Sequence, residues 1–347
     1  MEGQGTGSAI SPRLAEHLSR AEAAVFWPVA LKDRLGGSGR AGAALGLAVL
    51  AALIGWEHPG GLAGAFAAPD PGVLGRALFY ALSLALILSF AALIPRAAQR
   101  DLDALAGVLA LDGPGQARAR AALVRSPSGA VVLQAGIGAA LGIVHFWLSG
   151  GLGGTGFLIA NVALWSLMVQ TGALLVVNAL LFAALGAEGV RVDPLAPDRL
   201  RSFVTTALRP MLLIMSLLAA YPLMLPVAES WGASTLIGPG ATLLLALAAV
   251  WFPLRGLAGR LRTERDRALD RVAAEVSLAW PRLDQEPEAA ARLEALLALR
   301  DRLRTAPILP LALPGLGKAA LYLALPLATW TGRGVAEALL DRLLGAG

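Results

Sequence analysis

The sequence of 347 residues contains no cysteine and only three histidines. Without cysteine the chain has no disulfide framework, no thiolate metal site and no thiol nucleophile. Three histidines leave few ligands for zinc, so we expect no metal site and no cofactor. The sequence also lacks a P-loop and the GxSxG, HExxH and DxD motifs, which are the usual residues of ATPases, serine hydrolases and metalloproteases. These absences favour a protein that is not an enzyme.

Charged residues are scarce as well. They make up 15% of the chain, whereas hydrophobic residues make up 56%, and the mean hydropathy is +0.66. Soluble globular domains have about 25% charged residues, so the composition is typical of an integral membrane protein whose surroundings are the lipid bilayer. The 29 basic residues exceed the 24 acidic ones. In a membrane protein such an excess belongs to cytoplasmic loops, so we expect no nucleic-acid partner.

Apolar runs long enough to cross a bilayer recur along the chain. The sequence predicts membrane spans at residues 41–56, 73–94, 129–149, 156–185, 211–227 and 236–252. From Gly156 to Gly186 there is no charged residue, and a helix of that length would measure about 46 Å. It exceeds a hydrocarbon core of about 30 Å, so we expect this helix to be tilted or to protrude. The predicted fold class is all-α, a polytopic membrane helical bundle of about six spans within residues 41–256.

The positions of the basic residues predict the orientation. Residues 1–40, 96–128, 187–210 and 255–305 contain five, five, four and eleven basic residues, whereas the connections 57–72, 150–155 and 228–235 contain none. Because basic loops stay on the cytoplasmic side, we expect the N-terminus in the cytoplasm. Arginine supplies 27 of the 29 basic residues on an Ala-, Leu- and Gly-rich background. That composition favours a bacterial inner (plasma) membrane.

Three segments lie outside the predicted spans. In residues 1–40 no secretory signal is expected. Ser11-Pro12 predicts the start of an amphipathic helix at the cytoplasmic interface, in which apolar residues recur at helical spacing as far as Val29. In residues 257–305 the apolar residues Leu269, Val272, Val276 and Trp280 form a helical stripe that ends at Trp280-Pro281, and a second stripe follows. This pattern predicts a cytoplasmic antiparallel helical hairpin. Residues 306–347 are apolar but broken by proline, and only 14 uncharged residues separate Lys318 from Arg333. We therefore expect an interfacial or re-entrant segment, the alternative being a seventh span.

Polar side chains inside the third and fourth predicted spans are the candidates for a functional site. They are Gln134, His145, Asn161, Ser166, Gln170, Thr171 and Asn178. Counted from the link between these spans, His145 lies at the depth of Asn161 and Gln134 at the depth of Gln170. Asn161 and Gln170 are about 180° apart on a helix, so both pairs cannot meet in straight helices. One interpretation is a polar track for an ion or proton. The other, which the lack of acidic residues favours, is interhelical hydrogen bonds worth about 0.6 kcal/mol each.

A short glycine motif occurs twice. Gly42-Ala-Ala-Leu-Gly46 in the first predicted span is repeated as Gly138-Ala-Ala-Leu-Gly142 in the third. The repeat indicates either a duplicated helical hairpin or a coincidence in an Ala-, Gly- and Leu-rich chain. Small residues four apart allow two helices to approach closely in a membrane. We expect Gly42, Gly46, Gly138 and Gly142 to face other helices.

Four stretches of the C-terminal half form a pattern: the loop Asp193–Asp198, the stretch after Phe252, the Trp330-Thr-Gly332 motif, and Glu337 to Asp341. Together they resemble a family of uncharacterised bacterial six-span membrane proteins. That family has HPD followed by GGL in the loop and HR after the sixth span. Here Ala196 replaces the first His, Arg199 to Ser202 replace the glycines, and Ala258-Gly259 replaces the second His. The resemblance covers residues 190–345 and implies the fold rather than an activity.

Together these features predict a non-enzymatic integral membrane protein. The leading hypothesis is a scaffold or sensor-type module that forms homo-oligomers, or binds an unknown protein partner, through its Gly-rich spans and its cytoplasmic hairpin. The alternative is a channel or transporter with a polar track between spans three and four. A pore without rings of charge would be weakly selective, which counts against the alternative.

Overall fold

The structure, a computed structural model, describes residues 11–35, 38–148, 153–224, 233–282, 287–306, 317, 320–326 and 328–329. Within these residues the fold is all-helical, as the sequence predicts, and the only β-type pairings are two isolated bridges. The long helices are α3 (Ser38–Glu57), α5 (Pro71–Ala104), α7 (Ser128–Leu148), α8 (Thr155–Glu188), α9 (Arg201–Ala220), α10 (Ala233–Ala279) and α11 (Pro287–Thr305). The glycine-rich link between α7 and α8 lies largely outside the described residues.

Shorter elements connect the long helices. They are α1 (Pro12–Ser19), α2 (Trp27–Leu35), α4 (Gly61–Ala67), α6 (Gly113–Ala122) and the 3₁₀ turns Arg20–Glu22, Pro197–Leu200, Tyr221–Met224 and Trp280–Arg282. Side-chain caps explain two helix starts. The Asp70 carboxylate accepts hydrogen bonds from the first backbone N–H groups of α5, and Asp112 does the same for α6. In both helices a proline follows the cap within two residues, where its missing N–H costs no helical hydrogen bond.

Four stretches are long and apolar enough to cross a membrane: α5, α7, α8, and Asp198–Met224, which includes α9. The bent pair of α3 and α4, which meet at 86°, raises the number to five if it counts as one span. The structure thus supports four to five candidate spans in the described residues and does not establish six. The sixth predicted span falls on α10, in which the side chains of residues 233–242 lie outside the described residues.

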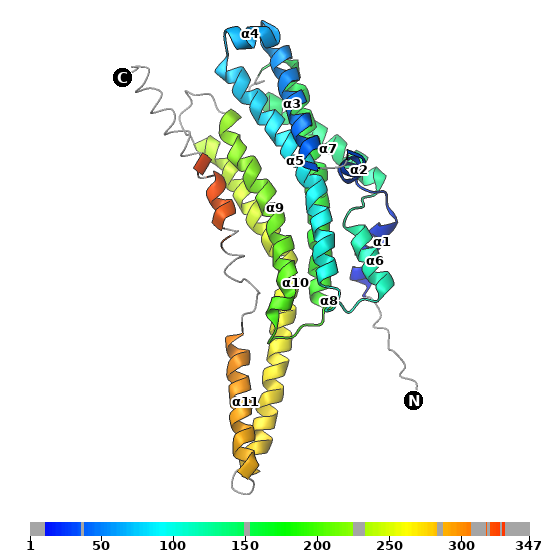
Figure 1. Cartoon of the computed structure of the whole chain (residues 1–347), viewed down its shortest axis with the longest axis vertical. Coiled ribbons are helices and arrows are strands. Elements are labelled where there is room, and N and C mark those ends of the chain that lie inside the picture. The colour runs from blue at the N-terminus through cyan, green and yellow to red at the C-terminus, as the bar shows by residue number, and fades with distance from the viewer. Residues whose placement is uncertain are drawn as a thin grey trace, which may run out of the picture.

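Two prolines lie directly after the second and the sixth predicted spans. Pro95 is inside α5, which continues to Ala104, and Pro253 is inside α10, which continues to Ala279. Both helices therefore pass their proline without ending. The apolar helices are compatible with a membrane location, and α10 runs on from the bundle into a hairpin with α11 (Figure 1).

The N-terminal helix begins as the sequence predicts. The Ser11 hydroxyl accepts a hydrogen bond of 3.2 Å from the backbone N–H of Leu14, which caps α1. Leu14 and Leu18 are buried against the bundle. The apolar face of α1 therefore packs against other helices of the protein.

The predicted continuous helix from Ser11 to Val29 is wrong, because the chain leaves the helix at the 3₁₀ turn Arg20–Glu22 and resumes at α2. Between them Val25 forms a β-bridge with Arg125, and the Phe26 N–H donates to the Val124 carbonyl at 2.8 Å. These long-range backbone bonds replace helical ones, and sequence periodicity cannot reveal them.

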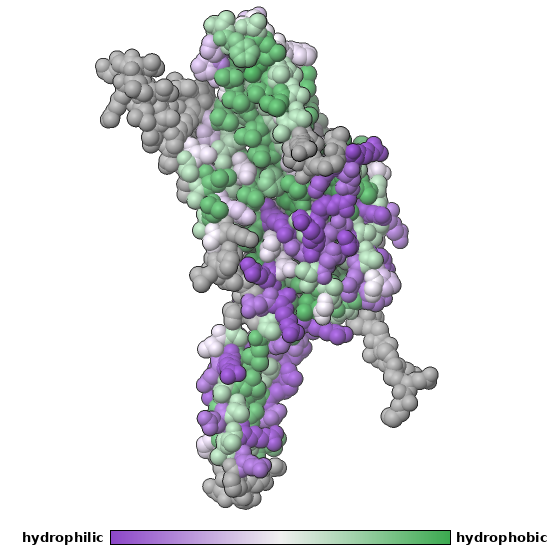
Figure 2. All heavy atoms as spheres, viewed as in Figure 1, coloured by the Kyte–Doolittle hydropathy of each residue, from purple (hydrophilic) through white to green (hydrophobic). Residues whose placement is uncertain are grey.

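The bundle has two distinct ends (Figure 1). At the end called here the basic end lie α1, α6 and the connections 105–112 and 189–200; at the opposite end lie α4 and the start of α8. Figure 2 shows hydrophilic side chains over α1, α2 and α6 and hydrophobic ones over α3 and α4. This two-ended arrangement agrees with the separation of basic and uncharged loops along the sequence.

Buried side chains form one cluster toward each end. The cluster toward the basic end includes Leu102, Leu123, Phe182, Phe203 and Leu257, and the cluster toward the opposite end includes Phe79, Tyr80, Phe146 and Phe157. The helices α5, α8 and α9 each contribute to both clusters, so they connect the two ends of the bundle.

Beyond the basic end, α10 and α11 form an antiparallel hairpin around Val272, Leu296 and Leu303. Trp280, which the sequence analysis placed on the buried stripe, is exposed at the turn. Most of residues 306–347 lie outside the described residues, so the interfacial or re-entrant form stays a prediction. Of the part described, Tyr322 and Leu323 pack against the cluster toward the basic end.

Candidate functional site

His145 and Asn161, which the sequence places at the same depth, are in contact. The Nδ1 atom of His145 lies 3.3 Å from Oδ1 of Asn161. The Tyr80 hydroxyl donates to the same oxygen at 3.3 Å, and the Asn161 amide donates to the Gly142 carbonyl at 2.6 Å. Because the amide oxygen only accepts, His145 carries its proton on Nδ1 in this contact. Asn161, which is buried, joins α5, α7 and α8.

Two residues near this contact were missed by the sequence analysis. Nothing in the apolar sequence of α5 indicates that the Tyr80 hydroxyl has a hydrogen-bond partner. Glu57, at the end of α3, accepts hydrogen bonds from the backbone N–H groups of Gly154, Gly156 and Phe157 at 2.8, 2.6 and 3.2 Å. A carboxylate there satisfies N–H groups that lack helical partners and complements the helix dipole. The N–H groups that donate to Glu57 are about 100 positions away in sequence, which is why no local capping motif reveals it.

Arg76 was also missed, although it is visible in the sequence as the one basic residue between positions 41 and 95. It lies on α5 near the end opposite to the basic end. Its guanidinium carbon is 5.3 Å from the centroid of the Phe157 ring, a cation–π arrangement. Its long side chain allows the charge to lie near the end of the helix while the stem stays among apolar groups.

A different face of α8, away from Asn161, forms hydrogen bonds with the N-terminal segment. The Trp27 indole N–H donates to Oε1 of Gln170 at 2.8 Å. Arg20 donates to the Val177 carbonyl at 3.2 Å, and Asn178 donates to the Leu123 carbonyl at 2.9 Å. Gln170 and Asn178 therefore bind segments near the basic end, on another side of α8 from Asn161.

The remaining polar candidates have separate surroundings. Gln134 is half-buried on α7, while Gln170, at the same predicted depth, binds Trp27. The Ser166 hydroxyl donates to the Ala135 carbonyl at 3.2 Å, which ties α8 to α7. Thr171 is buried, and its hydroxyl has no hydrogen-bond partner among the residues that the structure describes. The structure thus brings His145 and Asn161 together and distributes the other polar candidates over different faces.

All four glycines of the repeated motif lie in contacts between helices of this chain. A Cβ atom on Gly46 would lie 3.0 Å from the Ala85 Cβ of α5, and one on Gly142 would lie 2.8 Å from the Val162 Cα of α8. Gly42 lies against Ser89, and Gly138 against the backbone of Ser166. The motif of α3 packs on α5, and the motif of α7 packs on α8. These glycine surfaces are therefore already covered by helices of the same chain.

Charged groups gather at the basic end. Asp101 of α5 forms an ion pair with Arg209 of α9 and accepts a hydrogen bond of 2.5 Å from the Thr206 hydroxyl. Burial lowers the pKa of Arg20 to about 10. Burial, and next the charge of Arg20, lower the pKa of His17 below its usual 6.5. The basic end therefore contains partly desolvated cations in addition to exposed ones.

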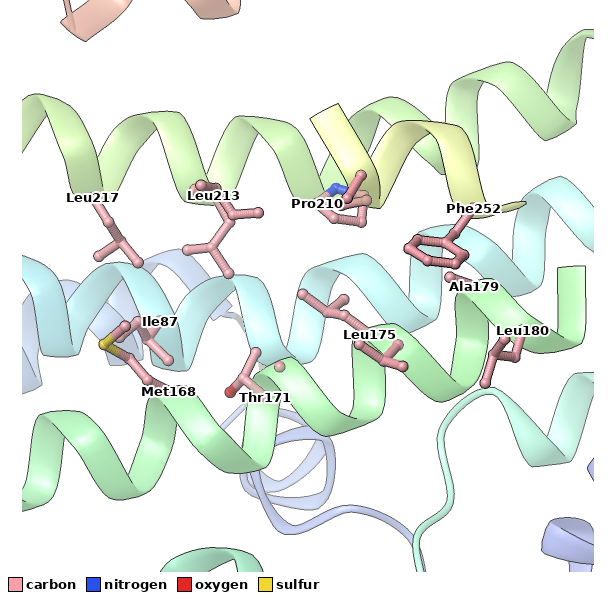
Figure 3. A pocket seen from close by; sticks show the side chains of 15 residues that line it. Ile87, Met168, Thr171, Leu175, Ala179, Leu180, Pro210, Leu213, Leu217 and Phe252 are labelled. Carbon is pink, nitrogen blue, oxygen red and sulfur yellow. The ribbon is translucent and has the colours of Figure 1, made fainter. Parts of the chain in front are cut away.

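A lateral cavity of about 260 Å³ lies between α5, α8, α9 and α10. In Figure 3, Leu213 and Leu217 of α9 face Met168 and Leu175 of α8 across it. The lining is apolar apart from Thr171. Such a cavity accommodates hydrocarbon better than an ion.

Among the described residues no group of three or more His, Cys, Asp or Glu side chains is placed to hold a metal ion. Comparison of the chain with protein-family models, with curated proteins and with solved structures finds no match. The function is therefore inferred from the contacts themselves.

Proposed function

We propose that this chain is an integral membrane protein of the bacterial inner membrane, with its N-terminus in the cytoplasm, and that it acts as a non-enzymatic scaffold or sensor-type module. One observation carries the proposal. Helix α10 runs for 47 residues, about 70 Å, from the bundle into the hairpin without a break. A shift of α10 within the bundle would therefore move the hairpin with it.

The polar contacts of α7 and α8 support a packing role. Asn161, Gln170 and Asn178 each bind a different segment, and each bond joins parts of the chain that are far apart in sequence. Bonds of this kind fix helix packing in a membrane. A track for ions would need polar groups that follow one another along one face.

The surface for protein partners is part of the same proposal. The four motif glycines already pack within the chain, so self-association has to use another surface. The hairpin presents two large apolar side chains at its tip, Leu278 and Trp280, which are 68% and 64% exposed. Aromatic residues are enriched in protein interfaces, so we assign the contact with a second copy to this tip.

Single cysteine variants test this function in a chain that has no cysteine of its own. Ser277→Cys, at the exposed residue before Leu278, keeps both apolar side chains and in native membranes should form a disulfide-linked dimer under mild oxidation. Val132→Cys, at an exposed position of α7, is the matched control and should remain monomeric.

Reconstituted liposomes provide the complementary measurement. A scaffold should leave proton and ion permeability unchanged. Flux that depends on the wild-type chain and is lost in Asn161→Leu, together with a monomeric Ser277→Cys variant, would favour the channel or transporter instead.

A further inference from the structure

The lateral cavity is elongated along α8. Its lining runs from Met168 to Leu180 of that helix, a rise of about 18 Å. At one end lie Ile87 and Leu217, and at the other lies Phe252 (Figure 3). A long, narrow, apolar space matches a hydrocarbon chain.

The cavity opens toward the surroundings of the bundle. Val176 of α8 and Phe252 of α10 line it and are 56% and 43% exposed. Of the helices around it, α5, α8 and α9 belong to the candidate spans. Its opening therefore lies at the depth of lipid hydrocarbon.

A cation lies where the cavity ends near Phe252. The guanidinium carbon of Arg255 is 4.8 Å from the centroid of the Phe252 ring. Arg255 is exposed and takes part in none of the ion pairs formed by the described residues. Its charge is thus free to bind an anion at the end of the apolar space.

The next turn of α10 closes the cavity on that side. Gly256 lies against the carbonyl of Ala183, and a Cβ atom on Gly186 would be 3.0 Å from the Leu257 backbone nitrogen. The close approach of α8 and α10 leaves no room for a ligand beyond this point. A lipid acyl chain that enters the cavity from the side would therefore have its polar headgroup beside Arg255.

We propose that the cavity binds one acyl chain of an anionic phospholipid, with the phosphate on Arg255. Contact between the chain and the cavity gives little selectivity, because bilayer lipid is as apolar as the lining. Selectivity comes from the charge, and one arginine near the headgroups gives a preference of about fivefold for an anionic over a zwitterionic lipid.

Native mass spectrometry of the full chain in mild detergent tests the proposal. The probes are phosphatidylglycerol and phosphatidylcholine with identical acyl chains. The wild type should bind phosphatidylglycerol about fivefold more strongly. Arg255→Gln should remove the preference, whereas Arg271→Gln, on the exposed part of the hairpin, should retain it.

Occupancy of the cavity is tested separately by Gly172→Leu. Gly172 lines the cavity, and a Cβ atom there meets nothing within 4 Å, so leucine fills the space without a clash. Binding of both lipids should fall. The control is Gly136→Leu, which also adds a side chain at an open position, on α7.

Equal binding of the two lipids by the wild type, or a preference that survives Arg255→Gln, overturns the proposal. An unchanged Gly172→Leu variant also overturns it. If the wild type takes no lipid but a chain ending at residue 305 does, the occupant is the segment 306–347, and the lipid assignment is wrong.

Discussion

The Asn161 side chain of α8 donates a hydrogen bond of 2.6 Å to the carbonyl oxygen of Gly142 on α7. The absence of a side chain on Gly142 permits this bond, because a Cβ atom there would lie 2.8 Å from the Val162 Cα. Close packing and hydrogen bonding between the two helices therefore depend on the same residue.

Replacement of the packed glycines should destabilise the bundle. Gly138→Leu and Gly142→Leu each force α7 away from the α8 backbone. Overpacking of this kind costs about 1–3 kcal/mol, which lowers the melting temperature by several degrees. Thermal unfolding in detergent measures the effect. Gly136→Leu, at an open position of the same helix, is the control, and an equal effect of all three variants would contradict the assigned contact.

The three-helix contact at Asn161 should show energetic coupling. Tyr80→Phe removes one hydrogen bond, which in membranes averages about 0.6 kcal/mol. Asn161→Leu should cost more, because it also leaves the Gly142 carbonyl without this donor. A double-mutant cycle on thermal stability should give a combined loss smaller than the sum of the two. Strict additivity would show that the two side chains act independently.

The carboxylate of Glu57 should stabilise the start of α8. Glu57→Ala leaves three backbone N–H groups without their acceptor, and loss of a helix cap costs about 0.5–2 kcal/mol. Glu57→Gln should recover part of the loss, since the amide oxygen still accepts. Thermal stability of the two variants, beside that of exposed Glu22→Ala, tests this order. Equal stability of Glu57→Ala and the wild type would mean that water replaces the cap.

Cysteine labelling should reveal the orientation. Gly61 and Gly153 have positive φ values of 60° and 103°, which disfavour a side chain, so neighbouring exposed positions are better probes. Ala67→Cys and Thr155→Cys should react with a membrane-impermeant maleimide on intact cells, and Ala117→Cys only after lysis. The opposite pattern would place the N-terminus outside.

Acidification should weaken the packing of α1. The pKa of His17 in the folded chain lies below its ordinary 6.5, so folding favours the neutral ring. The contribution of His17 to the free energy of unfolding is complete above pH 6.5. It is lost as the pH falls from 6.5 through the lowered pKa. Between pH 7.5 and 5.5 the melting temperature of the wild type should fall more than that of His17→Gln. An identical fall would assign the pH dependence to other groups.

Local features of the sequence located the elements well. Ser11-Pro12 marks the start of α1, and a hydrogen bond from Leu14 confirms the cap. The lengths of the apolar runs correctly predicted α5, α7 and α8. In lipid an apolar run must form a helix, because a helix satisfies the hydrogen bonds of its own backbone. The separation of Asn161 from Gln170 by about 180° also correctly excluded that both bind α7.

Contacts between distant parts of the chain were beyond such reasoning. Trp27 binds Gln170 across 143 positions, and Glu57 caps a helix that begins about 100 positions later. The break between α1 and α2 arises from backbone bonds to residues near Val124. None of these partners is marked by local periodicity, since each depends on how the helices are arranged in space.

By itself the sequence determined that the chain is helical, which stretches are apolar enough to enter a membrane, and at which end arginine gathers, because these properties depend on the residues of each segment and their preference for lipid or water. The tertiary structure alone decided that the repeated glycines pack within the chain, that Asn161 joins three helices, and that Arg255 lies over the ring of Phe252, which lines a lateral cavity. Which face of a helix packs against its neighbours depends on how well the whole surfaces fit together. That fit involves side chains from segments far apart in the sequence.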